Sequence, residues 1–77
     1  MNDRTKILIQ FLIVAEEYDI EIIKINFRNI TNILDEVEFT FKNEHDKFII
    51  KFSYEKNNMY DVNSAWRYIK HELEELL

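Results

Sequence analysis

The chain has 77 residues, 47% of them hydrophobic and 14% aromatic, and its net charge is −5; this composition favours one folded domain over residues 1–77 and argues against disorder. The absence of Cys excludes disulfides and thiolate metal sites and fits a reducing compartment, so we expect a cytoplasmic protein. The absence of Gly excludes the phosphate-binding loop, the dinucleotide-binding fingerprint and the nucleophile elbow, because each of these motifs requires Gly.

Residues 4–18 are predicted to form a helix that is too short to span a bilayer. Its candidate N-caps are Asn2, Asp3 and Thr5. Most of its apolar residues recur at helical spacing and are expected to face the core, namely Ile7, Leu8, Phe11, Leu12, Val14, Ala15 and Tyr18. Ile9 and Ile13 lie off this arc, next to each other on the helix surface. They are covered either by a second layer of the same domain or by a partner, and the sequence leaves both readings open.

Residues 20–28 are predicted to form the first strand, because Ile23, Ile25 and Phe27 alternate with polar residues. Ile22 has the opposite parity, which predicts a bulge near Ile22 and Ile23. A helix is the alternative, since helical spacing also connects Ile20, Ile23, Phe27, Ile30 and Leu34. The β-branched residues and the Asn residues of this segment favour a strand followed by a loop over residues 29–35.

Residues 36–42 and 47–55 are predicted to form a hairpin around the loop Asn43–Asp46, with Lys42 opposite Lys47. This register places the apolar residues of both strands on one face, namely Val37, Phe39, Phe41, Phe48, Ile50 and Phe52. On the other face it pairs opposite charges, Glu38 with Lys51. The first strand joins the same sheet with Phe27 opposite Val37, Ile25 opposite Phe39 and Arg28 beside Glu36. Because the hairpin loop has no Gly, we expect a left-handed residue there, at Asn43, His45 or Asp46.

Residues 62–77 are predicted to form a second helix that starts at Asp61 or Asn63. A regular seam is expected to face the core, formed by Val62, Trp66, Ile69, Leu73 and Leu76, with Ala65 and Leu77 beside it and Tyr68 at the rim. The sequence therefore predicts an α+β fold: a helix, a three-stranded antiparallel meander and a helix, with both helices on one sheet face.

No constellation of residues predicts catalysis or cofactor binding. His45 and His71 lack a second His or Cys at ligand spacing, so no metal site is expected. Glu72, Glu74 and Glu75 lie on an exposed helix tail, which is not the desolvated cleft that perturbs a catalytic pKa. We therefore expect a binding protein that is not an enzyme and has no cofactor.

The predicted topology places the C-terminal ends of both helices and the hairpin loop at one end of the domain. This end holds nine of the 15 acidic residues, and we call the set the acidic pole: Glu16, Glu17, Asp19, Glu21, Glu44, Asp46, Glu72, Glu74 and Glu75. One reading is that these residues provide solubility. The other is that they dock on a basic, nucleic-acid-facing surface of another protein, whose activity the chain inhibits.

The open face of the predicted sheet mixes charges of both signs around Ile49, which suits a protein partner better than phosphate. Nucleic-acid binding is the alternative function, and it would use the lysines of this face, namely Lys24, Lys42, Lys47 and Lys51.

The element order resembles that of the double-stranded-RNA-binding domain over nearly the whole chain. In that family a basic motif opens the last helix, and here the matching stretch is "DVNSAWRYIK", with Arg67 and Lys70 as its bases. In size, element order and acidity the chain also resembles the small acidic inhibitors encoded by mobile elements, such as anti-CRISPR proteins, and interbacterial immunity proteins have the same general character. The second resemblance implies inhibition by binding to another protein.

A last expectation concerns self-association. If the two helices pack side by side, Ile9, Ile13 and Tyr68 can border one exposed apolar strip. Such a strip usually marks an interface, and a two-fold homodimer is the simplest closed use of it.

Overall fold

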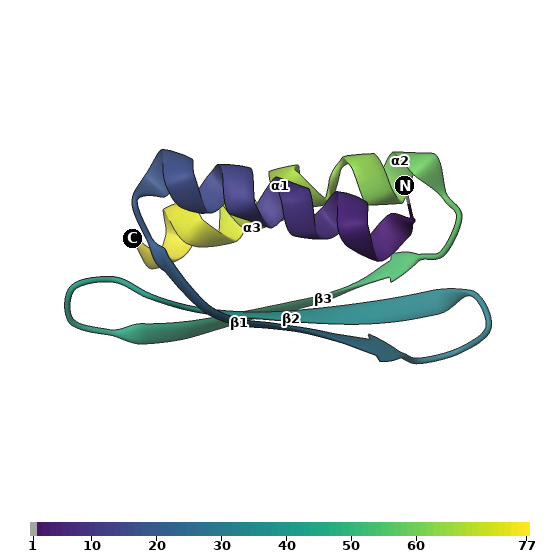
Figure 1. The fold of residues 1–77 in the computed structure, drawn as a ribbon, viewed down its shortest axis with the longest axis horizontal. Helices are drawn as coiled ribbons and strands as arrows, with labels where there is room; N and C mark the ends of the chain where they lie inside the picture. Colours follow the sequence, from purple (N-terminus) through teal and green to yellow (C-terminus); the bar gives the residue numbers. More distant parts are fainter. Residues whose placement is uncertain (1) are drawn as a thin grey trace.

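The structure is a computed structural model that describes residues 2–77. It consists of two layers, a three-stranded sheet and a layer of helices that crosses one face of it (Figure 1). The elements in chain order are α1 (Asp3–Tyr18), β1 (Glu21–Asn29), β2 (Leu34–Lys42), β3 (Lys47–Glu55), α2 (Met59–Asn63) and α3 (Ala65–Leu76). The predicted α+β fold, with its antiparallel meander and its helices on one sheet face, is confirmed.

The register of the sheet matches the predicted register at every pair named above. Phe41 lies opposite Phe48, Phe39 opposite Ile50 and Phe27 opposite Val37, while the ladder is irregular between Ile22 and Lys24, where the bulge was predicted. The helical alternative for this segment is wrong, because β1 pairs along its whole length. The loop between β1 and β2 is shorter than predicted, since the ladder continues to the Asn29–Asp35 pair. The backbone N–H groups of Ile33 and Leu34 donate to Thr31 Oγ1 in this loop.

The hairpin loop Asn43–Asp46 turns without a left-handed residue, so that expectation is wrong. The side-chain oxygen of Asn43 accepts hydrogen bonds from the backbone N–H groups of His45 and Asp46, at 3.1 and 3.0 Å. An Asn side chain that bonds the following backbone in this way replaces a backbone turn. The left-handed residues are Asp19, with φ 52°, and Asn57, with φ 60°, and each lies next to a helix.

The core lies between the sheet and the helices. Phe11 of α1 stacks on Phe39 of β2 with ring centroids 4.7 Å apart, and Phe39 stacks on Phe41 at 5.2 Å. Buried residues from every layer surround these rings: Ile7, Val14, Val37, Ile50, Tyr54, Val62, Ala65, Ile69 and Leu73. Four residues expected in the core are instead partly exposed, at 37–53% of their surface, namely Leu8, Leu12, Trp66 and Leu76. The helices form a single layer, so no second layer covers these positions on its flanks.

The C-terminal helix is broken at Ser64 into α2 and α3, although one helix was predicted. The cause is Gln10 of α1. Its amide nitrogen donates to the carbonyl oxygen of Val62 at 2.7 Å, and its amide oxygen accepts from the N–H of Trp66 at 2.8 Å. In a continuous helix these two backbone groups would bond each other, and a side chain inserted into that bond kinks the helix. The predicted caps are also wrong, because Asn58 caps α2.

Candidate functional site

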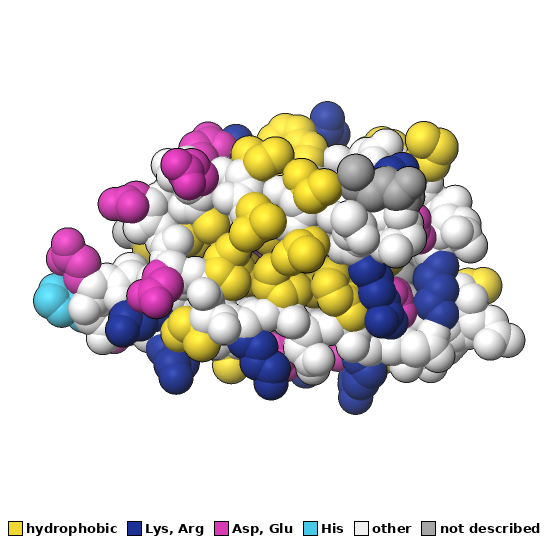
Figure 2. Space-filling model, viewed as in Figure 1, with side chains coloured by type: hydrophobic (Ala, Val, Ile, Leu, Met, Phe, Trp, Pro, Cys, Tyr) yellow, Lys and Arg dark blue, Asp and Glu magenta, His cyan; other side chains and the backbone are white. Residues whose placement is uncertain are grey.

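The acidic pole is assembled as the topology predicted. The C-terminal ends of α1 and α3 and the β2–β3 hairpin loop lie at the same end of the molecule (Figure 1). Most acidic side chains visible in Figure 2 gather at this end. Asp19 ends α1 in a left-handed conformation, and its N–H donates to the carbonyl oxygens of Ala15 and Glu16. Neither long helix has a basic residue in its last turn to offset the negative end of the helix dipole.

Most charges of the acidic pole are not neutralised within the chain. In the part of the chain that the structure describes, Glu17 is the one member that pairs with a Lys or Arg, at 3.0 Å from Lys70. The hydroxyl of Tyr18 donates to Glu74 at 3.1 Å and ties the ends of α1 and α3 together. Partial burial and this bond to Glu74 raise the pKa of Tyr18. Glu44 and Glu75 lie 3.8 and 4.0 Å from the imidazoles of His45 and His71. The other members form no ion pair in the described residues and are available to a partner, namely Glu16, Asp19, Glu21, Asp46 and Glu72.

A hollow of about 330 Å³ opens inside the acidic pole, between the last turns of α1 and the start of β1. Leu12, Ala15, Ile20 and Ile22 give it an apolar lining, and the acidic residues Glu16 and Asp19 also line it. Leu12 is 53% exposed, although its spacing predicted a core residue. An apolar wall beside carboxylates matches the aliphatic stem and the charged head of a Lys or Arg side chain.

The predicted apolar strip is divided by the structure. Ile9 and Ile13 are 38% and 61% exposed, and Figure 2 shows hydrophobic side chains gathered over α1. Ile13 and Trp66 line a groove of about 300 Å³ between α1 and α3. Tyr68 is not part of this surface, because its ring packs 4.7 Å from that of Phe52 on the β3 side of α3. Trp66 is therefore the exposed apolar residue of α3 that lies beside Ile13.

The open face of the sheet carries its basic residues around an acidic centre. Glu36 and Glu38 lie on the central strand, and Lys51 lies 4.0 and 3.9 Å from their carboxylates. Arg28 also pairs with Glu36, at 3.1 Å. A phosphate backbone crossing this face would meet carboxylates in its middle, which is unfavourable because phosphate contacts dominate nucleic-acid binding.

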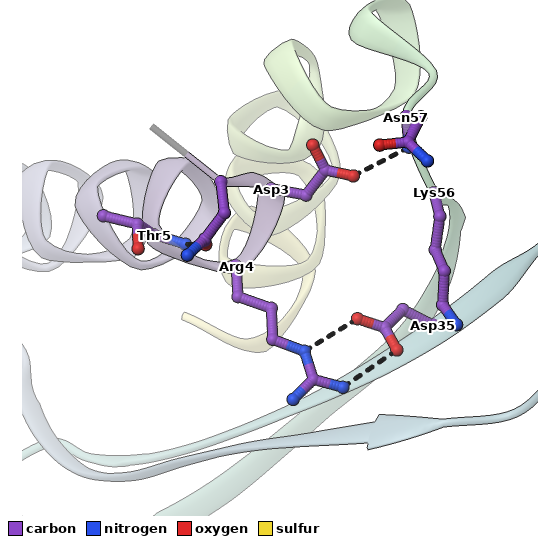
Figure 3. A pocket seen from close by; sticks show the side chains of 7 residues that line it. Asp3, Arg4, Thr5, Asp35, Lys56 and Asn57 are labelled. Carbon is purple, nitrogen blue, oxygen red and sulfur yellow. Dashed lines mark hydrogen bonds and ion pairs between the residues drawn. The ribbon is translucent and has the colours of Figure 1, made fainter.

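The end of the molecule opposite the acidic pole holds a hollow of about 500 Å³ at the start of α1 (Figure 3). Arg4 donates two hydrogen bonds to the carboxylate of Asp35, at 2.9 and 3.0 Å, and the Tyr54 hydroxyl donates a third at 2.7 Å. Asp3 accepts from the N–H of Asn57 at 2.7 Å and joins α1 to the segment before α2. The Arg4 bonds lower the pKa of Asp35, and burial with the Asp35 bond raises the pKa of Tyr54.

This network was missed by sequence reasoning, which placed Asp35 in a loop. The signal was present, since Asp35 has the same parity as Val37 and Phe39 and so continues the core-facing row of β2. Every buried side-chain nitrogen and oxygen in residues 2–77 has a hydrogen-bond partner. The buried groups of the network are therefore satisfied within the chain.

No group of three His, Asp or Glu side chains in residues 2–77 could hold a metal ion. In the same residues, no helix has the length and apolar character needed to cross a membrane. Comparisons of the chain with protein-family models, with curated proteins and with solved structures find no match.

Proposed function

We propose that this protein is a small acidic binding module that inhibits a partner protein by docking its acidic pole on a basic, nucleic-acid-facing surface. The observation that carries the proposal is the hollow that is lined both by the apolar residues Leu12, Ile20 and Ile22 and by the acidic residues Glu16 and Asp19. It offers one Lys or Arg of the partner both apolar contact and charge, which the acidic residues alone do not offer. A cytoplasmic location fits this role.

Inhibition follows from competition for the same cations. Lys and Arg residues that hold nucleic-acid phosphates also bind carboxylates, and Arg does so with two parallel hydrogen bonds. The carboxylates gathered at the ends of α1 and α3 and in the hairpin loop would steer a basic surface toward this end and speed association. Binding to the pole is then expected to weaken as salt rises.

The experiment is a titration of the isotope-labelled protein with an Arg-rich peptide, followed by NMR at low and at physiological salt. Amide shifts are expected to concentrate at residues 16–22, around the hollow. The triple variant Glu72→Lys/Glu74→Lys/Glu75→Lys is expected to bind about tenfold more weakly, because it reverses three nearby charges. A matched control, Asp3→Lys/Glu55→Lys/Asp61→Lys, makes the same charge change away from the pole. Equal weakening by both triple variants, with both folds intact by circular dichroism, would reject the acidic-pole mechanism.

Nucleic-acid binding through Lys24, Lys42, Lys47 and Lys51 is less well supported. Lys51 is already engaged by two carboxylates, and these carboxylates occupy the middle of the face. A gel shift with double-stranded RNA, single-stranded RNA and DNA at ~0.1 M salt tests this alternative, because phosphate contacts persist at that salt concentration. A shift that Lys24→Glu/Lys47→Glu abolishes would favour nucleic-acid binding over the acidic-pole proposal.

A further inference from the structure

The outward surface of α1 carries a regular row of four residues. Lys6, Ile9, Ile13 and Glu16 follow one another at intervals of three, four and three residues, which keeps them on one narrow arc of the helix. We call this set the α1 row. The core-facing residues of the same helix, Ile7, Phe11 and Val14, lie on the opposite arc. The α1 row therefore points away from the sheet and toward solvent.

The charges at the two ends of the α1 row have no partner within the described chain. No ion pair among residues 2–77 includes Lys6 or Glu16, whereas the adjacent Glu17 is bound by Lys70. Between these two charges, Ile9 and Ile13 expose 38% and 61% of their surface. The row thus reads as basic, apolar, apolar and acidic from the start of α1 to its end.

The α1 row can pair with the α1 row of a second copy that runs in the opposite direction, because each charge then meets the opposite charge and each Ile meets an Ile. A two-fold axis that crosses α1 at the level of Phe11 places Ile9 opposite Ile13 of a second copy and Lys6 opposite Glu16 of that copy. The Ile9–Ile13 contact and the Lys6–Glu16 contact each occur twice, as a two-fold interface requires. A parallel arrangement would instead place Lys6 against Lys6 and Glu16 against Glu16. We propose that the protein forms a homodimer through antiparallel packing of its α1 rows.

The surroundings of the row fit this partner. The groove between α1 and α3 runs beside Ile13, and Trp66 supplies its far wall. Large aromatic residues are enriched at the buried centres of interfaces. Lys70 lies 5.2 Å from the Trp66 ring and 3.0 Å from Glu17, so the far wall is held in place before association. Four Ile side chains flanked by two Trp side chains then form the apolar centre, and the Lys6–Glu16 pairs form its charged edge.

The proposed dimer also has a defined consequence for the acidic poles. α1 runs along the longest dimension of the molecule, 38 Å (Figure 1). Antiparallel packing of α1 therefore directs the two poles to opposite ends of the dimer. Glu16 belongs to both proposed surfaces, but the dimer proposal does not rest on the proposed function, because it is tested without any partner protein.

Sedimentation equilibrium of the wild type at ~100 μM tests the dimer, since ordinary specific interfaces have dissociation constants near or below ~1 μM. The wild type is expected to be dimeric and Ile9→Glu/Ile13→Glu monomeric. The control Ile33→Glu/Ile49→Glu changes two Ile residues that are 63% and 61% exposed elsewhere, and it is expected to stay dimeric. A monomeric wild type, or equal effects of the two double variants, would overturn the proposal.

Charge exchange tests the antiparallel geometry. Lys6→Glu and Glu16→Lys each create two like-charge contacts in the dimer, and each is expected to raise its dissociation constant about tenfold. The double variant Lys6→Glu/Glu16→Lys restores both pairs and is expected to return within about threefold of the wild type. A double variant as weak as either single variant would overturn the antiparallel arrangement. Circular dichroism of each variant confirms that the fold is retained.

Discussion

At the end of the molecule where α1 begins, charged groups face inward and are paired; at the end where α1 finishes, they face solvent. Asp35 is 3% exposed and accepts hydrogen bonds from Arg4 and Tyr54. The acidic pole, in contrast, pairs with Lys or Arg in the described residues only through Glu17. The comparison shows two uses of carboxylates: the one of Asp35 is buried and stabilises the fold, while most of those in the acidic pole are left to interact with solvent or another molecule.

The largest expected effect is at the paired end. Asp35→Ala removes the acceptor of Arg4 and Tyr54 and leaves the buried Tyr54 hydroxyl without a partner. We expect the free energy of unfolding to fall by about 2–3 kcal/mol, because a buried polar group without a hydrogen bond is costly while the half-exposed Arg4 can turn to water. Urea unfolding followed by circular dichroism measures this loss.

Glu44→Ala in the hairpin loop is the control at the acidic pole, and we expect a change within about 0.5 kcal/mol. Similar losses for Asp35→Ala and Glu44→Ala would show that the two ends do not differ in their contribution to folding.

The second largest expected effect is a loss of folding stability at acidic pH. The Arg4 and Tyr54 hydrogen bonds lower the folded-state pKa of Asp35 below its usual value of 3.8. The stabilisation from this carboxylate is therefore complete at neutral pH, starts to fall near pH 4 and is lost as the pH drops through the folded-state pKa.

Urea unfolding of the wild type and of Asp35→Asn between pH 7 and pH 2 measures this dependence. The wild type is expected to lose more stability than the variant below pH 4, because the variant has no carboxylate to protonate at this position. Parallel pH profiles would place the acid-sensitive group elsewhere in the molecule.

The smallest effect is at the acidic pole. Asp19→Asn keeps a residue that tolerates the left-handed conformation at the end of α1 and removes a negative charge from the negative end of the helix dipole. We expect the free energy of unfolding to rise by about 0.3–1 kcal/mol at low salt, and the gain to shrink as salt screens the dipole. Thermal unfolding at two salt concentrations measures it, and a loss of stability would mean that Asp19 makes a favourable contact in the fold.

The sheet could be predicted closely because its information is local. In the hairpin, one register satisfies both the apolar row of Phe39 and Phe41 and the Glu38–Lys51 pair, so no distant residue is needed to choose it. The acidic pole followed from the element order alone. The hollow within it did not, since it required the exposed position of Leu12 beside Ile20 and Ile22.

The residues that were misread depend on partners far along the chain. Asp35 was placed in a loop because its partner Arg4 lies 31 residues away. The break in the C-terminal helix was not predicted, because Gln10 bonds Val62 and Trp66, which lie 52 and 56 residues away in the sequence. Tyr68 was grouped with Ile9 and Ile13 because the rotation of α3 about its own axis is not fixed by periodicity.

The position of Gln10 has a consequence for the synthesis of the protein. Gln10 is made 52 residues before Val62 and 56 residues before Trp66, whose backbone groups satisfy its amide. The Ile69 and Leu73 side chains that complete the core are made later still. At roughly 5–20 residues per second, this interval lasts several seconds, and α1 spends it without its neighbours from α2 and α3. The core of the domain is therefore completed only after α3 has been made.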